Sequence, residues 1–283
     1  MLRCLSDDAL HALIREDAPF GDLTTQALAL KSAVGDVVVA SRQPMTVCGV
    51  EEAARVFELV GGHVHGLTAS GQHVLSDVPL LTVHGPVAAL MSCADVAQNL
   101  IQRASGVASE VARMVTELRA AGHSTTLACP PQSWPGARAL TIKAVTAGGG
   151  VMHRMGLSDG VLLTPNHRVF LDQSIDDMVG RLRKHQPERK LVCLAASLDE
   201  AMAFALAGSE IIQLDSMSPE SVRATRVALH NSRLHPMLAV SGDVHAGNAV
   251  AYADAGADVL VSASVYLAPP REVECRFSRP LPQ

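Results

Sequence analysis

The chain has 283 residues, of which 48% are hydrophobic and 18% charged, and its formal net charge at pH 7 is −5. This length suits one large α/β domain, or a barrel with a smaller partner domain. The mild negative charge argues against a nucleic-acid-binding protein, which usually has a basic face. No run of about 18 apolar residues occurs, so we expect no membrane span.

Six cysteines are scattered along the sequence without a Cys-x-x-Cys pair. This usage is typical of reduced, mostly buried thiols, so we expect a cytoplasmic protein without a disulfide framework or a zinc site. The charged N-terminal segment also lacks the apolar core of a signal peptide. His63 and His65 form a His-x-His pair, but a solvent-exposed strand or loop explains it better than a metal site.

The first third of the chain is predicted to form an α/β unit of its own. Ser6 can cap an N-terminal helix. A strand is expected at 34–42, a helix at 49–60 and a strand–turn–strand pattern at 65–86. A long helix follows at 90–121, and its many small residues indicate tight packing against a neighbour.

Beyond residue 123 the pattern changes to apolar strands that alternate with helices. This alternation predicts a parallel sheet with right-handed crossovers, and the continuous apolar runs are typical of buried strands. An open doubly wound sheet and a barrel both satisfy the pattern, since six strands are fewer than the eight of a standard barrel. The candidate strands are 124–129, 160–164, 190–195, 210–215, 236–242 and 258–264.

Polar residues follow several of these strands at their carboxyl ends, where functional sites gather in either architecture. Ordinary turn residues would explain each of them singly. The last two strands, however, lead into small-residue loops whose backbone N–H groups can bind an anion, so we predict a phosphate site there. The residues that follow the strands in this way are Asn166, His167, Asp215, Ser241, Gly242, Asp243, Ser262 and Ser264.

Cationic side chains form a second group of candidates. Arg103 lies on a small-residue face of the long helix, and His153 and Arg154 follow three consecutive glycines, which allow the backbone to turn these side chains inward. For a lone arginine, a surface position paired with a carboxylate would be the better explanation. For the combined set we favour an anion site, because the arginine fork matches carboxylate and phosphate geometry.

At these residues the sequence resembles the quinolinate phosphoribosyltransferase family, and within it the ModD branch associated with molybdenum transport genes. The resemblance covers nearly the whole chain, in the same order and spacing. It is carried by "EDAPFGDLTT" (16–25), "QRASGVAS" (102–109), "PGAR" (135–138), "AVTAGGGVMHRMGLSDGVLL" (144–163), "NHR" (166–168), "LDSMSPE" (214–220), "SGDV" (241–244) and "GADVLVSASVYLAPP" (256–270).

The resemblance implies an α/β fold in three parts. An N-terminal α/β sandwich with its connecting helix is expected at 1–110, and an incomplete parallel α/β barrel of about six strands at 111–268. A C-terminal tail at 269–283 is expected to return towards the N-terminal domain. The family also implies a homodimer or higher homo-oligomer, in which the partner's helix bearing Arg103 completes the site.

The same resemblance implies a pyrophosphorylase reaction, in which quinolinate and phosphoribosyl pyrophosphate react with Mg²⁺ and release pyrophosphate and CO₂. Arg103, His153 and Arg154 would hold the carboxylates of the acid. Asp215 would face the ribose or its Mg²⁺. Such a site must hold several anions in place while positive charge develops on the sugar. The expected substrate- and phosphate-binding residues are Arg138, Asn166, His167, Ser241, Gly242, Asp243, Ser262 and Ser264.

The chain departs from the family pattern where charge is concerned. The family's Arg-Lys pair ahead of Pro-Gly falls on Pro131 and Gln132. Its lysine before Asn-His falls on Thr164, its glutamate on the next strand on Leu194, and a glycine of the last strand on Ala263. Removing one charge-assisted hydrogen bond costs about 1.5–3 kcal/mol. We therefore expect an anionic substrate other than quinolinate.

The sequence also allows two other functions. A catalytically silent protein would keep the pocket to bind a phosphate, a nucleotide or an oxyanion such as molybdate, in connection with molybdenum uptake. A purely structural dimer partner would use the helix at 90–121, but it leaves the cations beside the glycines unexplained.

Overall fold

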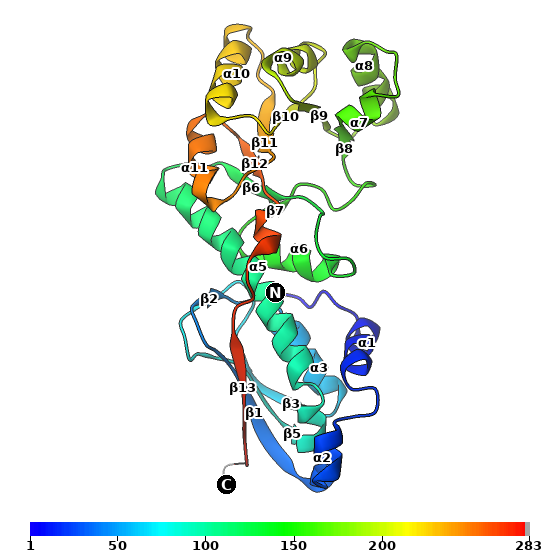
Figure 1. Ribbon diagram of the computed structural model, residues 1–283, viewed down its shortest axis with the longest axis vertical. Helices are drawn as coiled ribbons and strands as arrows, with labels where there is room; N and C mark the ends of the chain where they lie inside the picture. Colours follow the sequence, from blue (N-terminus) through cyan, green and yellow to red (C-terminus); the bar gives the residue numbers. More distant parts are fainter. Residues whose placement is uncertain (281–283) are drawn as a thin grey trace. The chain divides into compact units, whose positions relative to one another are not determined.

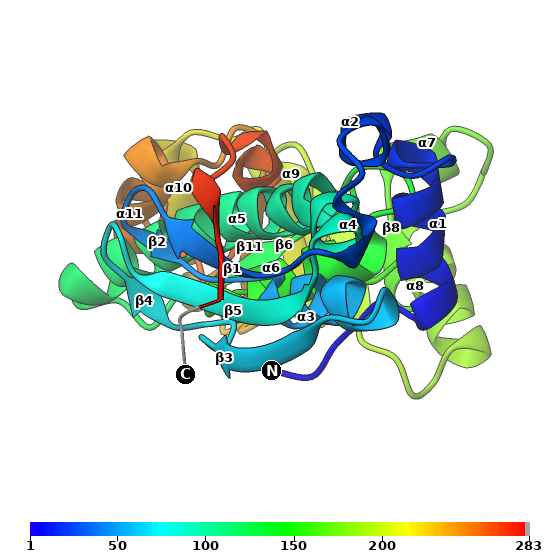
Figure 2. The ribbon, with the colours of Figure 1, turned by 90° about the horizontal axis from the view of Figure 1, so that it is seen from below.

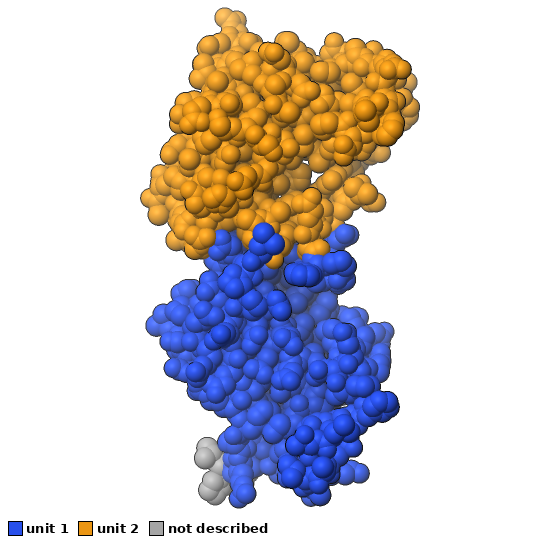
Figure 3. Space-filling model, in the orientation of Figure 1, with its two compact units in different colours: residues 1–112, 134–149, 267–283 blue, residues 113–133, 150–266 orange. Residues whose placement is uncertain are grey.

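The computed structural model describes residues 1–280 and divides the chain into two compact units (Figure 1, Figure 3). Unit 1 comprises residues 1–112, 134–149 and the C-terminal segment from residue 267, and unit 2 comprises residues 113–133 and 150–266. Residues 281–283 of the expected tail lie outside the described residues. The domain boundaries at 110 and 268 stay predictions.

Unit 1 is built on a four-stranded antiparallel sheet in the order β13-β1-β5-β3. β1 (Val34–Ser41) lies between β5 (Pro79–Pro86) and β13 (Val273–Ser278), so a strand from the far end of the chain completes the N-terminal sheet. β3 (His63–Leu67) pairs with the other side of β5 (Figure 2). β2 (Met45–Thr46) and β4 (His73–Val74) form a separate two-stranded ladder.

The core of unit 1 lies between this sheet and its helices. Buried residues of α1 (Asp7–Asp17), α3 (Val50–Leu59) and the first half of α5 (Ala94–Ala120) pack in one cluster with those of the strands. Val37 and Val39 of β1 are fully buried while Asp36 and Val38 are less so, the period of two that a strand with one face on a core requires. The short helices of this unit are α2 (Leu23–Ala27), η1 (Leu30–Ser32), α4 (Val87–Met91) and α6 (Arg138–Ala147).

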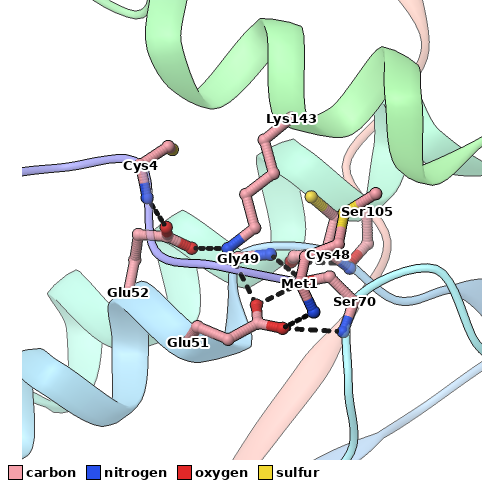
Figure 4. A network of polar contacts seen from close by, with 9 residues as sticks. All are labelled: Met1, Cys4, Cys48, Gly49, Glu51, Glu52, Ser70, Ser105 and Lys143. Carbon is pink, nitrogen blue, oxygen red and sulfur yellow. Dashed lines mark hydrogen bonds and ion pairs between the residues drawn. The ribbon is translucent and has the colours of Figure 1, made fainter.

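A buried ion network also holds unit 1 together (Figure 4). The Lys143 ammonium on α6 donates to Glu51 Oε2 at 2.8 Å and to Glu52 Oε2 at 2.6 Å. Both carboxylates belong to the first turn of α3, and the side chains of Glu51, Glu52 and Lys143 are only 12%, 0% and 5% exposed. The Ser70 backbone N–H and the N-terminal ammonium of Met1 also donate to Glu51. Every charge in the network is therefore paired.

Unit 2 is a seven-stranded parallel sheet in the order β7-β6-β12-β11-β10-β9-β8. A helix lies between each pair of successive strands except β7 and β8, which stand at opposite edges of the sheet and are joined by the non-helical segment 153–160. Its strands are β6 (Thr126–Cys129), β7 (Val151–Met152), β8 (Val161–Leu163), β9 (Leu191–Ala195), β10 (Ile211–Asp215), β11 (Met237–Ser241) and β12 (Val259–Val261). Its helices are α7 (Pro165–Arg168), α8 (Ile175–His185), α9 (Leu198–Leu206), α10 (Pro219–Asn231) and α11 (Ala246–Asp254), with the 3₁₀ turn η2 (Ser264–Leu267) at its end.

The predicted architecture, an N-terminal α/β unit and an incomplete parallel barrel, is confirmed. All six predicted barrel strands are present, and a seventh, β7, follows the glycine triplet. β7 has two residues, which is too short to show any periodicity in the sequence. The long helix expected at 90–121 is in fact α4 and α5, separated by a turn at 92–93.

Other local predictions have clear outcomes. The Ser6 side chain accepts a hydrogen bond from the Ala9 backbone N–H and caps α1 as predicted. His63 and His65 are exposed on β3, which confirms the solvent-exposed strand. Four of the six cysteines are buried and two are half-buried. Among residues 1–280, every helix falls short of the length and apolar character that a bilayer span requires.

Candidate active site

Two neighbouring strands of unit 2 end in a hydrogen-bonded polar pair. Asp215 is the last residue of β10 and Ser241 the last of β11, and the parallel register sets them side by side. The Ser241 hydroxyl donates to Asp215 Oδ1 at 2.6 Å. Two residues predicted separately as site residues therefore meet at the carboxyl edge of the sheet.

The turn after Ser241 requires glycine. Gly242 has φ +105°, and a Cβ built on it would lie 2.7 Å from Ser216 Oγ and 2.8 Å from Ser216 N. The Ser216 N–H in turn donates to the Ser241 carbonyl at 2.9 Å, which joins the loops after β10 and β11. Without a side chain, the Gly242 backbone is accessible to a ligand. Asp243 is exposed in the same loop, and its carbonyl accepts from the Asn248 side chain of α11.

Sequence reasoning missed Gln213. This residue lies two positions before Asp215 on β10 and so on the same face of the sheet. Its side chain is buried, and its Nε2 donates to the Ser241 hydroxyl at 2.9 Å. Ser241 therefore lies between an amide and a carboxylate. The available signal was one polar residue inside the apolar run "IIQLD", spaced by two from the predicted Asp215.

His153 and Arg154 follow β7 at the same end of the sheet. The His153 backbone N–H donates to the Cys129 carbonyl at the end of β6 at 2.8 Å. Burial lowers the pKa of His153, and the positive charge of Arg154 lowers it further, while the Gln213 side chain acts in the opposite direction. Since an ordinary histidine has a pKa near 6.5, the His153 imidazole is neutral at pH 7.

A cavity of about 970 Å³ opens beside β8. It is lined by β8, α7, α8 and the segment that precedes β8. Arg154, Asn166 and His167, three predicted site residues, contribute to its wall, and so does Thr164, one of the positions that lack the family's charge. Further titratable groups in the wall are Asp159, Arg181, His185 and Arg189, and the apolar lining includes Leu157, Leu162, Phe170, Met178 and Leu182.

The short helix α7 uses some of these groups for its own capping. The Thr164 backbone N–H donates to His167 Nδ1 at 3.1 Å, and the Thr164 hydroxyl lies 2.8 Å from the same atom. Nδ1 therefore acts as an acceptor, so neutral His167 carries its proton on Nε2. Arg168, the last residue of "NHR", pairs with Glu200 at 2.8 Å and is not available as a free cation.

The predicted serines after β12 are hydrogen-bonded to each other. Ser262 Oγ donates to the Val244 carbonyl at 2.6 Å and lies 2.8 Å from Ser264 Oγ. The Ser264 N–H in turn donates to Ser262 Oγ at 3.3 Å. These contacts fix the loop after β12 to the loop after β11, which keeps the two predicted phosphate-binding loops together.

Arg103 and Arg138 belong to unit 1. Arg103 is exposed on α5, and Arg138 is exposed as the first residue of α6. The site formed by unit 2 alone thus contains His153, Arg154, Asp215 and the loops after β11 and β12. It does not contain these two arginines.

The positions that depart from the family pattern also belong to unit 2. Pro131 and Gln132 lie in the loop after β6, and Leu194 lies on β9. Leu194 is the register neighbour of Gln213 on β10. At this level of the sheet the chain therefore carries an apolar residue beside an uncharged amide.

Comparisons with known proteins agree with this architecture. Residues 22–105 match the family model "Quinolinate phosphoribosyl transferase, N-terminal domain", and residues 107–271 match the model of the C-terminal domain. A Rhodobacter capsulatus protein named "Putative pyrophosphorylase ModD" is 44% identical over 87% of this chain and 95% of its own length. The nicotinate-nucleotide pyrophosphorylase [carboxylating] of Mycobacterium leprae is 31% identical over 89% of this chain and 90% of its own length.

A solved structure gives the same result for the fold. NadC from Streptococcus pyogenes superposes with a TM-score of 0.88 at 26% identity, over 98% of this chain and 99% of that one. Sequence and structure thus match the same family over both units. The chain therefore belongs to the quinolinate phosphoribosyl transferase family, with a ModD-like sequence.

Proposed function

We propose that this chain is a phosphoribosyltransferase of the pyrophosphorylase type, which joins an anionic substrate to the ribose of phosphoribosyl pyrophosphate and releases pyrophosphate. Family membership over nearly the whole chain supports it, as do relatives that are named pyrophosphorylases. One observation carries the proposal. The Asp215–Ser241 pair places a carboxylate next to the open backbone turn at Gly242, at the end of a parallel sheet where such sites form.

Each part of the site has a task in this reaction. Positive charge develops on the ribose as pyrophosphate leaves, and the Asp215 carboxylate would stabilise it electrostatically. Ser241 would hold that carboxylate in one orientation. Backbone N–H groups at Gly242 and in the following loop would bind phosphate oxygens. Arg154, which lines the cavity beside β8, would hold the anionic group of the acceptor substrate.

Phosphoribosyl pyrophosphate implies Mg²⁺. Within residues 1–280 no group of three or more His, Cys, Asp or Glu side chains surrounds one metal position. Mg²⁺ is commonly held by one or two carboxylates together with substrate phosphates and water. Asp215 at the strand end therefore fits a metal that arrives with the substrate. Bound there, Mg²⁺ would neutralise charge on the departing pyrophosphate.

The substrate is proposed to be an anion other than quinolinate. Pro131, Gln132, Thr164 and Leu194 stand where the family resemblance implies three cations and a carboxylate. Each missing charge-assisted hydrogen bond costs about 1.5–3 kcal/mol, and each 1.36 kcal/mol of lost transition-state stabilisation slows a reaction tenfold. Quinolinate would therefore react slowly here, even if it binds.

Calorimetry with phosphoribosyl pyrophosphate and Mg²⁺ tests the proposal directly. We expect saturable binding that Asp215→Asn weakens and that Asp172→Asn, an exposed carboxylate after α7, leaves unchanged. Folded protein that gives no heat at millimolar ligand would overturn the proposal. Binding without pyrophosphate release for any acid of a broad panel would instead support the silent anion-binding alternative.

A homodimer completes the proposed site. The family resemblance assigns Arg103 to the partner's site, and Arg103 is exposed on unit 1. Mixing the variants Arg103→Ala and Asp215→Asn tests this, because one site of a mixed dimer would regain both native residues. We expect each variant alone to be inactive and the refolded mixture to recover up to about a quarter of wild-type activity. No recovery from a mixture shown to contain hybrid dimers would contradict the shared site.

A further inference from the structure

Histidines gather on the outer face of the unit 1 sheet, and none of them takes part in the proposed reaction. Val37 of β1 is fully buried in the core, so the next residue back, Asp36, lies on the opposite face. The register pairs Asp36 with His84 of β5, and His84 with His63 of β3. His65 lies two positions after His63 and therefore on the same face. One carboxylate and three imidazoles thus share one face of three adjacent strands (Figure 2).

Asp36 determines the orientation of the His84 ring. His84 Nδ1 lies 2.7 Å from Asp36 Oδ1, and because a carboxylate can only accept, Nδ1 carries the proton of this hydrogen bond. In the neutral ring the lone pair is then on Nε2. Since β5 lies between β1 and β3, the part of the ring remote from Asp36 faces β3. His84 therefore presents a nitrogen that can bind a metal towards the histidines of β3.

The ring of His65 lies beside that of His84. Their centroids are 6.3 Å apart, and the ring planes are inclined by 57°. The pairing of β3 with β5 is irregular between Val64 and Gly66, and such bulges re-aim the side chain that they contain. An imidazole nitrogen lies about 2.1 Å from a bound Zn²⁺, so two rings on one ion have centroids about 4.5–6.5 Å apart. The observed separation falls within this range.

We propose that His65 and His84 bind a divalent transition-metal ion, and that Asp36 is the outer carboxylate that orients His84. Imidazole nitrogen suits Zn²⁺, Ni²⁺ and Cu²⁺, of which Cu²⁺ binds most tightly. A ligating histidine usually donates its other N–H to a carboxylate, as His84 does here. Within residues 1–280 no three His, Cys, Asp or Glu side chains surround one metal position, so water completes the coordination. The ion joins the edge strand β3 to β5.

A second histidine pair in the chain provides a matched control. His230 and His235 of unit 2 are both exposed, and their ring centroids are 6.1 Å apart with the planes inclined by 67°. In contrast to His84, neither ring is paired with a carboxylate in the part of the chain that the structure describes. Comparing the two pairs separates the effect of the carboxylate from the mere proximity of two imidazoles.

Titration calorimetry of the full chain with Cu²⁺, in a buffer that does not bind metals, tests the site. We expect the tightest Cu²⁺ site to disappear in His65→Asn and in His84→Asn, and to remain in His230→Asn. Asp36→Asn should weaken it by about 10-fold to 100-fold, the usual effect of removing an outer-shell partner. Electron paramagnetic resonance of the bound Cu²⁺ should show coupling to two nitrogens. Unchanged affinity in His65→Asn or in Asp36→Asn would overturn the proposal.

Stability gives a second readout. An ion that binds only the folded sheet stabilises it by mass action, so Cu²⁺ should raise the urea midpoint of the wild type and not that of His65→Asn. A rise of equal size in both proteins would contradict the site. Circular dichroism shows whether each variant is folded, and His65→Asn, at an exposed position, keeps the test open if His84→Asn does not fold. Asp215→Asn should bind Cu²⁺ like the wild type, because the inference does not depend on the proposed reaction.

Discussion

Lys143 is the residue whose replacement should destabilise unit 1 most clearly. Its ammonium is bonded to both Glu51 and Glu52, and the three side chains are at most 12% exposed. Lys143→Met keeps the length and apolar stem of the side chain but leaves two carboxylates buried without their cation. Breaking a buried ion pair from one side costs about 3–5 kcal/mol. We expect a loss of that size in the free energy of unfolding at pH 7.

The pH dependence gives this prediction a second signature. Burial by itself would raise the pKa of Glu51, but hydrogen bonds from Lys143 and Ser70 lower it to about 2. The ordinary value is 4.5, so the wild type gains stability from Glu51 above pH 4.5 and loses it as the pH falls towards 2. In Lys143→Met the buried carboxylates instead favour protonation. The difference between wild type and variant in the free energy of unfolding should therefore become smaller as the pH falls below 4.5.

Urea unfolding followed by circular dichroism measures both effects. Arg42→Met is the matched control, since its pair with Glu274 has side chains 52% and 42% exposed and should contribute only about 0–1 kcal/mol. Adding Glu51→Gln and Glu52→Gln to Lys143→Met should recover part of the loss, because the uncompensated charges are then removed. A Lys143→Met variant within about 1 kcal/mol of wild type at pH 7 would refute the reasoning.

Three further predictions concern the glycine triplet and the site. Gly148→Ala would place a Cβ 2.5 Å from the Ala108 carbonyl oxygen and should destabilise the protein by about 1–3 kcal/mol in urea unfolding, whereas Gly180→Ala on α8 meets no atom within 4 Å and should be tolerated. Arg154→Ala should weaken binding of anionic acceptors by about 10-fold to 100-fold in titration calorimetry, and unchanged affinity would exclude Arg154 from the site. Ser241→Ala should lower kcat/KM for phosphoribosyl pyrophosphate by about tenfold or more, with a thermal midpoint that shows the variant is folded.

Periodicity allowed most of the barrel to be predicted, because its strands are continuous apolar runs bounded by helices. β7 was not predicted, because a strand of two residues shows no periodicity and its pairing with β6 is a tertiary contact. The antiparallel pairing of β1 with β13 could not be predicted from the local sequence pattern either. It was expected only through the family resemblance, as a tail that returns towards the N-terminal domain.

The candidate site was only partly predictable for a similar reason. Asp215 and Ser241 were each marked by their place at the end of a strand, and the parallel register then brought them together. Gln213 was missed because one polar residue in a strand has many ordinary explanations. The Lys143 network was missed too, since pairs about 90 positions apart leave no local trace in one sequence. Local chemistry was thus visible in the sequence, whereas partnerships between distant residues were not.

The strand β13 sets the order in which the protein can fold during synthesis. β1 leaves the ribosome early, but its partner from Val273 onwards follows about 230 residues later, on the order of 10–50 s of translation. During that interval β1 has an unpaired side, which is the kind of edge that recruits strands from other chains. All seven strands of unit 2 are complete before β13 emerges. The nascent N-terminal sheet therefore keeps an open edge, at which it can pair with other chains, until β13 has been synthesised.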